Sequence, residues 1–448
     1  MRVCVLGLWH LGSVTAAALA SLGHRVTGLD ENPDVVAGLA AADPPLFEPG
    51  LSELLRSGLD SGKLEFTTDP SRALQDADIL WVTFDTPLDD ADRADVRHVT
   101  SRVERIFQYL REGTVALISS QLPVGAVAAL EKNFRKKYPG CRVEFACSPE
   151  NLVLGHAIDA FLRPARIVLG VHPISQGPGP SAAREKLAEL LSPIGAPITW
   201  MSIPSAEMTK HALNAFLATS VVFANEIAGI CENTGADAAE VETALRSDPR
   251  VGPKAYVKPG GAFAGGTLAR DIGFLSALAR KNRVAIPMLR GVLTSNASHR
   301  LWPARRLQDR FKNMRGRRVA ILGLTYKPGT DTLRRSEAIR LLKWLIARKA
   351  RVSAFDPKIR SLPSPLSNRA RLAPSLENAL QGAEAAVVMT EWQDFKALTA
   401  EQVLSSMASP LILDPNRFLH RTLSGDARIR YISVGRAEKN MKTGKNRA

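Results

Sequence analysis

The sequence predicts an α/β protein in which two doubly wound parallel-sheet domains are joined by a helical middle region with a long central helix. Three observations lead to this fold class. Short runs that are apolar nearly throughout alternate with helix-like stretches near both ends of the chain, as is typical of strands covered on both faces. A long proline-free stretch with apolar residues at helical spacing separates them. Each end also repeats one order of apolar run, glycine, helix, strand and aspartate, which indicates two domains of nucleotide-binding size.

The first domain is predicted from six apolar runs. The N-terminal run is followed by an alanine-rich helical stretch at 13–23 and by a second run that ends in Asp30. Strands that are apolar on both faces need helices on both sides of their sheet, which is the doubly wound arrangement. The predicted strands lie within residues 3–8, 25–30, 77–84, 114–120, 143–148 and 165–171.

The middle of the chain is predicted to be helical. Residues 205–235 contain no proline and end at Asn233-Thr234-Gly235, a typical helix stop. A second helical stretch is expected from about Thr267 to Lys281. The long helix either links the sheet domains and forms a dimer interface, or is buried within one chain, and the sequence leaves both open.

Near residue 317 the N-terminal pattern begins again. RRVAILGLTYK (317–327) has the order strand, glycine and turn, an amphipathic helix is expected at 337–350, and further strands are predicted within 351–357, 383–392 and 410–416. We therefore expect domains at 1–202, 203–312 and 313–432, followed by a basic tail, 433–448. The tail has few apolar residues and is expected to be disordered.

Composition narrows the class of protein. The 448 residues are 45% hydrophobic and 23% charged, which is ordinary for a globular protein. We find no apolar run of the roughly 18–20 residues that a membrane span needs, and the N-terminus has no signal-peptide cleavage pattern. The four cysteines form no CxxC pair, so neither a disulfide framework nor a metal site is expected, and the reducing cytoplasm is the predicted compartment.

The charge indicates an anionic partner. With 59 basic and 44 acidic residues, the formal net charge is +15, which suits nucleic acid or a small phosphorylated substrate. We find neither an aromatic-rich basic strand nor a recognition-helix pattern. The small substrate is therefore favoured, with no nucleic acid and no membrane as partners.

A dinucleotide-binding turn is predicted at GLWHLG, residues 7–12. It follows a strand and opens a helix, so backbone N–H groups and the helix N-terminus can receive a pyrophosphate. Asp30 ends the next strand, where it would take the ribose hydroxyls and repel a 2′-phosphate, which favours NAD over NADP. Trp9 replaces the second glycine of GxGxxG and should change how closely the backbone approaches the phosphates. A purely structural βαβ turn is the alternative.

Eight stretches occur in order along the chain and carry a wider resemblance: GLWHLGSVTAA (7–17), FEPGLSELL (47–55), DTPLDDADRADV (85–96), SPENLVLGHAIDAFLRPARIVLG (148–170), AEMTKHALNAFLA (206–218), FAGGTLARD (263–271), LGLTYKPGTDTLRRS (322–336) and FDPK (355–358). Together they resemble the UDP-glucose/GDP-mannose dehydrogenase family from end to end. The resemblance implies two Rossmann-like domains bridged by a long helix, and a homodimer. It also implies the family's activity in polysaccharide biosynthesis, in which NAD oxidises the C6 alcohol of a nucleotide-sugar to a carboxylate in two hydride transfers.

The resemblance assigns catalytic roles residue by residue. Glu150 matches the family's active-site glutamate, which positions a water or acts as general base. Lys210 matches the oxyanion-stabilising lysine, and Asn214, one helical turn further on, matches its partner. Asp271 matches the aspartate that orients the attacking water, and Arg270 replaces a lysine beside it.

The resemblance also implies the binding residues. Lys327 matches a lysine that reaches the substrate from the second nucleotide domain, and Arg250 matches an arginine that crosses the dimer to the diphosphate or sugar. The expected cofactor contacts are Gly7, Trp9, His10, Leu11, Gly12, Asp30, Thr86 and Arg334, and the expected substrate contacts are Leu152, Arg250, Tyr256, Phe263, Gly265 and Lys327. Taken singly, such residues are usually solvated surface charges or helix caps; the ordered set is what favours a site.

Thr267 occupies the position of the family's catalytic cysteine. Loss of the first hydride gives an aldehyde, which must gain a nucleophile before a second hydride can leave. A cysteine thiolate adds readily, whereas an unactivated threonine hydroxyl is almost wholly un-ionised, and the local sequence has no histidine to act as its base. Cys147, just before Ser148, is the cysteine best placed to substitute, with burial as a small apolar residue as the alternative.

Three functional hypotheses remain open. In the first, an altered enzyme transfers one hydride and releases an aldehyde or ketone, or returns the hydride to the opposite face in a redox-neutral epimerisation. Thr267, and Leu154 in place of a second family glutamate, favour it. In the second, an ordinary 6-dehydrogenase oxidises the hydrated aldehyde to a uronate. In the third, the chain is a non-catalytic nucleotide-sugar binder, as Trp9 and Thr267 favour, although Lys210 and Asp271 are retained.

Overall fold

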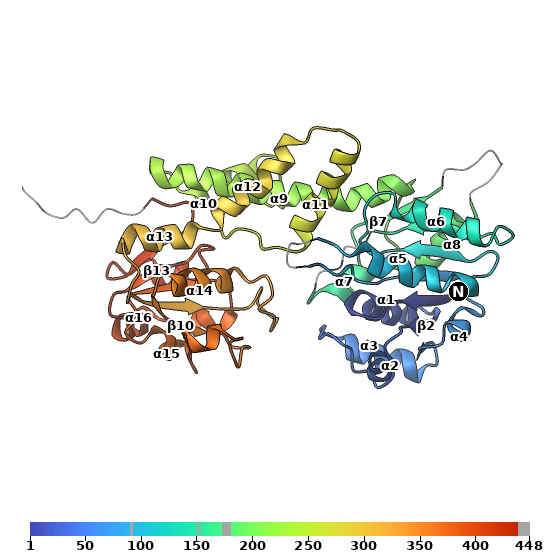
Figure 1. Cartoon of the computed structure of the whole chain (residues 1–448), viewed down its shortest axis with the longest axis horizontal. Coiled ribbons are helices and arrows are strands. Elements are labelled where there is room, and N and C mark those ends of the chain that lie inside the picture. Colours follow the sequence, from blue (N-terminus) through green and yellow to red (C-terminus); the bar gives the residue numbers. More distant parts are fainter. Residues whose placement is uncertain (90–92, 150–151, 153, 173–180, 438–448) are drawn as a thin grey trace, which may run out of the picture. The chain divides into compact units, whose positions relative to one another are not determined.

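The computed structural model of the chain describes residues 1–89, 93–149, 152, 154–172 and 181–437. The chain forms two compact units (Figure 1). The first comprises Met1–Leu213 with Gly273–Leu278, and the second comprises Asn214–Ile272 with Ala279–Ala448. Each unit holds one sheet covered by helices, so the predicted fold class is confirmed.

The sheet of the first unit has eight strands in the order β3-β2-β1-β4-β5-β6-β7-β8. All neighbouring strands run parallel except β6 and β7, which are antiparallel; the purely parallel sheet predicted from the apolar runs therefore holds only up to β6. The strands are β1 (Arg2–Leu6), β2 (Arg25–Leu29), β3 (Leu64–Thr67), β4 (Ile79–Val82), β5 (Val115–Ile118), β6 (Glu144–Cys147), β7 (Ile167–Val171) and β8 (Ile198–Ser202).

Helices cover both faces of this sheet because alternate strand residues point to opposite sides. In β1, Val3 and Val5 belong to one buried apolar cluster, and Cys4 and Leu6 belong to another on the other face. The helices of this unit are α1 (His10–Ser21), α2 (Pro33–Ala40), α3 (Leu51–Asp60), α4 (Pro70–Leu74), α5 (Val96–Arg105), α6 (Ala126–Lys137), α7 (Ala157–Leu162) and α8 (Ala182–Leu191), with 3-10 turns η1 (Phe107–Tyr109) and η2 (Ser192–Ile194).

The middle region is helical, as predicted. Its first helix is unbroken over 32 residues (Figure 1). The helices are α9 (Ile203–Thr234), α10 (Ala238–Ser247), α11 (Thr267–Lys281), α12 (Pro287–His299) and α13 (Trp302–Phe311).

By length and composition, α9 is the one helix in the described part of the chain that is apolar enough to cross a membrane, with a mean hydropathy of 1.4. The expectation that no such stretch exists is therefore wrong by this measure. A single helix of this kind is weak evidence, because the core helix of a globular protein passes the same test. Here α9 also buries Glu207, His211, Asn214 and Asn225, each hydrogen-bonded within the protein.

The second sheet has six parallel strands in the order β11-β10-β9-β12-β13-β14. Its strands are β9 (Arg318–Leu322), β10 (Arg351–Phe355), β11 (Ala370–Leu372), β12 (Ala385–Val388), β13 (Leu411–Leu413) and β14 (Arg430–Ile432). Its helices are α14 (Glu337–Ala347), α15 (Leu376–Leu380), α16 (Ala400–Ser406) and α17 (His420–Leu423), with 3-10 turns η3 (Leu366–Asn368) and η4 (Gln393–Ala397).

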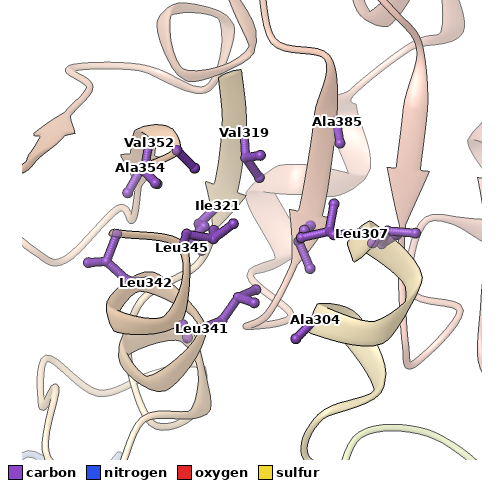
Figure 2. Packing of buried hydrophobic residues seen from close by; sticks show 14 of the residues in the cluster. Ala304, Leu307, Val319, Ile321, Leu341, Leu342, Leu345, Val352, Ala354 and Ala385 are labelled. Carbon is purple, nitrogen blue, oxygen red and sulfur yellow. The ribbon is translucent and has the colours of Figure 1, made fainter. Parts of the chain in front are cut away.

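One face of this sheet packs on α14 and α13. Figure 2 shows leucines of α14 and side chains of α13 meeting apolar residues of β9, β10 and β12. Leu342 and Leu345 of α14 are fully buried in this cluster, as is Leu307 of α13. The α14 leucines at i, i+1 and i+4 form the apolar side of the amphipathic helix that the sequence predicts over 337–350.

The packed chain continues beyond residue 432, where the third predicted domain ends. Ser433 and Val434 are buried, and the Gly435 N–H donates to Glu232 at 3.0 Å. Of the tail predicted to be disordered, residues 438–448 lie outside the described part of the chain.

Candidate active site

The turn after β1 requires glycine at two of its positions. Gly7 has a φ of +93°, and a Cβ there would lie 2.5 Å from the Phe84 ring. A Cβ on Gly12 would lie 1.8 Å from the Gly7 carbonyl oxygen. Any side chain at either position would force the turn open, so the tight approach of α1 to β1 depends on both glycines.

Trp9, between these glycines, adopts an ordinary backbone conformation. Its φ is −70°, so the main chain does not need glycine there, and its side chain is 46% exposed. Helix α1 begins at the next residue, His10, and has no acidic residue in its first turn. The helix N-terminus therefore keeps the positive end of its dipole without a nearby carboxylate of its own first turn.

Asp30 lies at the carboxyl end of β2, beside this turn. It is half-buried, and its carboxylate accepts the Leu8 N–H at 2.7 Å and the Asn32 N–H at 3.0 Å. Each carboxylate oxygen has further accepting capacity. The turn and Thr86 flank the point between β1 and β4 where the strand order reverses, which is where doubly wound sheets bind ligands. These residues fit a dinucleotide.

Glu48 is hydrogen-bonded to the side chain of His10, the first residue of α1. Its buried carboxylate contacts His10 Nε2 at 2.9 Å and accepts the N–H groups of Gly155 and Ala157, both at 2.8 Å. Burial alone would raise the pKa of Glu48, but the bonds from Gly155, His10 and Ala157 outweigh it, so the pKa is lowered. Because a carboxylate only accepts, the imidazole carries its proton on Nε2. Glu48 thus ties α1 to the segment that precedes α7.

Lys210 lines a narrow cavity within the first unit. Residues at the carboxyl ends of β5 and β6, including Ser120, Gln121 and Cys147, form its walls together with Glu207 and Lys210 of α9. The Ser120 hydroxyl is buried there without a hydrogen-bond partner. Burial, and secondarily the nearby Glu207, raises the pKa of the Cys147 thiol far above its usual value. This cysteine therefore stays a protonated, buried thiol, which favours the apolar interpretation of it over the nucleophilic one.

In the second unit, three predicted residues stand together at the start of α11. The Asn214 amide of α9 donates a short hydrogen bond to Asp271, whose side chain is fully buried. Arg270 Nε lies 3.7 Å from the other oxygen of Asp271. Thr267 is the first residue of α11 and is exposed; Gly266, just before it, has a φ of +109° that favours glycine. The amide and guanidinium fix the orientation of the buried carboxylate.

A cavity of about 310 Å³ lies in the second unit at the carboxyl ends of β9, β12 and β13. Lys327 lines it, next to Thr325 and Tyr326, and so does Ala264 from the loop that leads to Thr267. Arg300 and Glu337, also in the wall, form an ion pair at 3.1 Å. Here, too, the cavity sits where the strand order reverses, between β9 and β12.

The other predicted residues are less concentrated. Arg250 is exposed and pairs with Asp248 at 2.7 Å, and Tyr256 is also exposed. Leu152 packs against the core of the first unit, and Arg334 is an exposed residue of the loop before α14. Glu150 lies outside the described residues. In the described part of the chain, no group of three or more His, Cys, Asp or Glu residues could hold a metal ion.

Sequence reasoning missed several polar residues of these sites. Glu48 lies within the FEPG stretch that carried the resemblance, but nothing in its spacing indicates a partnership with His10. Asn225, Asn296 and His299 bind the loop before Thr267. Their signal in the sequence is only that of polar residues on largely apolar helices.

Two doubly wound sheets, one with a dinucleotide-binding turn and one with a cavity at its switch point, are typical of dehydrogenases with separate cofactor and substrate domains. Three family models match successive parts of the chain. Residues 1–190 match the NAD binding domain of the UDP-glucose/GDP-mannose dehydrogenase family, residues 204–298 its central domain and residues 320–421 its UDP binding domain. The chain belongs to this family. It is an oxidoreductase that uses NAD, and its substrate is a nucleotide-sugar.

Individual relatives cover nearly the whole chain. A UDP-glucose 6-dehydrogenase of Pseudomonas aeruginosa is 32% identical over 97% of this chain and 98% of its own length. One from Rhizobium meliloti is 31% identical over 98% and 100%. Among solved structures, a UDP-glucose dehydrogenase of Pyrobaculum islandicum superimposes with a TM-score of 0.85 at 28% identity, covering 97% of this chain and 98% of that one.

Proposed function

We propose that this protein acts on a nucleotide-sugar with NAD but stops short of the family's full four-electron oxidation. It carries out a single two-electron oxidation, or a redox-neutral epimerisation in which a secondary ring carbon loses its hydride to NAD and regains it on the opposite face. The observation that carries this proposal is the hydroxyl of Thr267 at the first position of α11, where the resemblance places the nucleophilic cysteine.

The state of the chain's own thiols supports the proposal. All four cysteines lie in the described part of the chain, and three of them are buried. Burial raises the thiol pKa of Cys4 and Cys147, and burial followed by Glu112 raises that of Cys141. Cys231 is buried on α9. A high thiol pKa keeps sulfur protonated at neutral pH, and the thiol is a far weaker nucleophile than the thiolate.

The remaining groups suit the first step of the oxidation. NAD supplies the acceptor for the hydride. The Lys210 ammonium would stabilise negative charge on the sugar oxygen as its proton leaves. The Asn214–Asp271 pair holds a carboxylate in one orientation, from which it would position a water or take up a proton. None of these groups forms a covalent bond to the aldehyde, so the second oxidation lacks its trapping step.

A specific observation favours a second candidate. The relatives from Pseudomonas aeruginosa and Rhizobium meliloti are UDP-glucose 6-dehydrogenases, and the Asn214–Asp271 pair is in place. In this alternative, water oriented by Asp271 adds to the aldehyde, and the hydrate loses the second hydride to give a uronate. UDP-glucose is the substrate to test first in either case.

We also propose that the protein acts as a homodimer through α9. Phe216, Phe223 and Ile230 recur at seven-residue intervals, so they lie on nearly one line along the helix. They are 67%, 46% and 59% exposed, respectively. A line of large exposed apolar side chains is typical of an interaction surface.

The cytoplasm, and the absence of nucleic-acid or membrane partners, remain predictions from the sequence.

The stoichiometry of NADH tests the proposal. Purified protein is incubated with NAD and UDP-glucose, GDP-mannose or related nucleotide-sugars, and NADH and the product mass are measured. We expect one NADH per sugar, or none with an epimerised product. Two NADH per sugar with a uronate would establish the alternative, and binding of sugar without any product would identify a non-catalytic binder.

Thr267→Cys is the matched gain-of-function variant. If the rest of the site is intact, the restored thiol should raise uronate formation well above that of the unaltered protein. Thr267→Ser is its control, because it keeps a hydroxyl and should not gain the second oxidation. Equal uronate formation by all three proteins would remove position 267 from the mechanism.

A further inference from the structure

The loop of residues 259–267, which leads into α11, is bound at Gly260, Gly261 and Phe263 by side chains from elsewhere in the second unit. It supplies Gly261, Ala262 and Ala264 to the wall of the 310 Å³ cavity and ends at Thr267. Four of the nine residues of this loop are glycines, which restrict the backbone little by themselves. Something outside it must therefore fix where its backbone lies.

Asn296 of α12 binds both backbone polar groups of Phe263 in this loop. The Phe263 N–H donates to Asn296 Oδ1 at 3.0 Å, and Asn296 Nδ2 donates back to the Phe263 carbonyl at 2.8 Å. The residue is 2% exposed. A carboxamide offers a donor and an acceptor side by side, so it satisfies both backbone groups of one residue as a neighbouring strand would.

Asn225 of α9 holds the start of the loop in the same manner. Its Oδ1 accepts the Gly260 N–H at 2.9 Å, and its Nδ2 donates to the Gly261 carbonyl at 3.4 Å. It is 3% exposed. Two buried asparagines from two helices thus bind the backbone at the two ends of segment 260–263: Asn225 at Gly260 and Gly261, and Asn296 at Phe263.

Three further side chains complete the hold. His299 Nε2 donates to the Gly260 carbonyl at 2.8 Å, Arg300 Nη2 to the Phe263 carbonyl at 3.2 Å, and Asn416 Oδ1 accepts the Gly261 N–H at 2.6 Å. The backbone N–H and carbonyl groups of Gly260, Gly261 and Phe263 are therefore all bound by side chains. Because buried backbone polar groups are costly to leave unpaired, this arrangement selects one conformation of the loop.

We propose that Asn296 and Asn225 are positioning residues, which set the backbone of loop 259–267 and thereby the wall of the cavity that receives the nucleotide part of the substrate. This rests on the proposed function in that it takes the cavity ligand to be a nucleoside diphosphate. Neither asparagine needs to touch the ligand. Both act by presenting the loop in its binding conformation before the ligand arrives, so that binding does not have to order it.

The test compares Asn296→Ala with Ser295→Ala in the full-length protein. Ser295 is the adjacent residue on α12, but its hydroxyl donates to Glu226 and not to the loop. Two properties are measured: hydrogen exchange of the 260–263 amides, and the affinities for UDP and for NAD by calorimetry. Asn225→Ala extends the series if Asn296→Ala does not fold.

We expect Asn296→Ala to speed exchange at Phe263 and to weaken UDP binding about tenfold to a hundredfold, as the loss of hydrogen bonds that order a binding loop predicts. NAD affinity should be unchanged, because the NAD binding domain lies within residues 1–190. Ser295→Ala should behave like the unaltered protein. This pattern separates positioning from a general loss of stability, which would weaken both ligands.

Unchanged loop exchange and unchanged UDP affinity in Asn296→Ala would overturn the proposal. Equal loss of NAD and UDP binding would also overturn it, since the asparagine would then matter only for folding. Should the unaltered protein bind no UDP while Phe263 exchange still responds to Asn296→Ala, the positioning role stands and the nucleotide assignment of the cavity fails.

Discussion

The first turns of the two sheets begin alike and then diverge. Gly7 after β1 and Gly323 after β9 have φ values of +93° and +86°. Their N–H groups donate to Leu29 at 2.9 Å and to Phe355 at 2.8 Å, the last residues of β2 and β10. A Cβ on Gly7 would lie 2.5 Å from Phe84, which follows β4. A Cβ on Gly323 would lie 2.5 Å from Thr390, which follows β12. The backbone after the first strand is therefore alike in the two units: a glycine is required by both its φ and the close approach of a neighbouring side chain.

The helices that follow start differently. Helix α1 begins at His10 and has neither an acidic residue nor a side-chain cap at its N-terminus. Helix α14 begins only at Glu337, after a long loop, with an acidic first turn and with Ser336 accepting from Ala338 at 3.1 Å. The first N-terminus is left available to an anion, whereas the second is satisfied by its own chain.

The aspartates after β2 and β10 differ in the same direction. Asp30 is half-buried and accepts two backbone N–H groups. Asp356 is 3% exposed, and one of its oxygens accepts the N–H groups of Leu324 and Thr325 and the Trp392 indole at 2.7–3.0 Å. The same order of strand, glycine and aspartate therefore leaves a carboxylate partly open to solvent in one unit, where we propose that it binds the ribose of NAD, and holds the fold in the other. In the second unit, side chains of the loop, such as Lys327, line the cavity instead, and we propose that they bind the substrate.

The sharpest test of this difference is the pair Asp356→Ala and Asp30→Ala. Removing Asp356 leaves several buried donors unpaired, so we expect the free energy of unfolding of its unit to fall by about 3 kcal/mol. Removing Asp30 should cost less, about 1 kcal/mol, because its carboxylate is only half-buried and water can occupy the position that it leaves. Urea unfolding followed by circular dichroism measures both.

Binding should show the reverse order. Asp30→Ala is expected to weaken NAD binding by about tenfold or more through loss of the ribose contact, while Asp356→Ala, at a temperature where it is folded, should leave NAD affinity unchanged. Equal stability losses for both variants, or loss of NAD binding only in Asp356→Ala, would show that the comparison assigns the two carboxylates wrongly.

A second prediction concerns Glu48. Its carboxylate binds His10, the first residue of α1, whereas the start of α14 is capped by the adjacent Ser336. Because the pKa of Glu48 is lowered in the folded protein, its ionised form contributes to stability above the ordinary glutamate pKa of about 4.3. That contribution is lost as the pH falls through the lowered value. Glu48→Gln should therefore unfold with about 1–2 kcal/mol less free energy at pH 7 and approach the unaltered protein near pH 3.

Urea unfolding as a function of pH provides the measurement, with Glu53→Gln on α3 as a control in the same sequence stretch. Glu53 is exposed, so its substitution should change the free energy of unfolding little at any pH in this range. The prediction fails if the stability difference between Glu48→Gln and the unaltered protein stays constant from pH 7 to pH 3. The bonds from Gly155 and Ala157 would then not depend on the negative charge of Glu48.

The sequence was sufficient for the central strands and insufficient for the edges. Runs around Val5 and Ile321 are apolar on both faces, and such strands are recognisable without the structure. The strands that sequence reasoning missed are β3, β8, β11 and β14, which are the two edges of each sheet. Edge strands are short and partly exposed, so their residues need not be apolar: β8, Ile198–Ser202, has no fully buried residue.

The same physical limit applies to the site. Gly7, Gly12 and Asp30 were predictable because backbone geometry restricts which residues fit the turn. The Asn214–Asp271 bond joins the first half of α9 to the first turns of α11. The family resemblance identified the two residues separately but did not predict the bond between them. Glu48–His10 and Asn296–Phe263 pair residues distant in sequence through ordinary polar groups, and no local pattern announces such pairs.

The smallest expected effect concerns Trp9, the residue that departs from the GxGxxG pattern. With its backbone at a φ of −70°, glycine is not required there, and the exposed indole leaves the turn without packing into the core. Trp9→Gly should therefore change the free energy of unfolding by about 1 kcal/mol or less, mainly through backbone entropy. NAD affinity measured by calorimetry should change by less than about fourfold, or under about 1 kcal/mol, because the backbone needs no glycine at this position and should keep its conformation. A much larger gain in NAD affinity would show that the indole obstructs the phosphates, and the first turn would then be less open to its ligand than its bare helix N-terminus indicates.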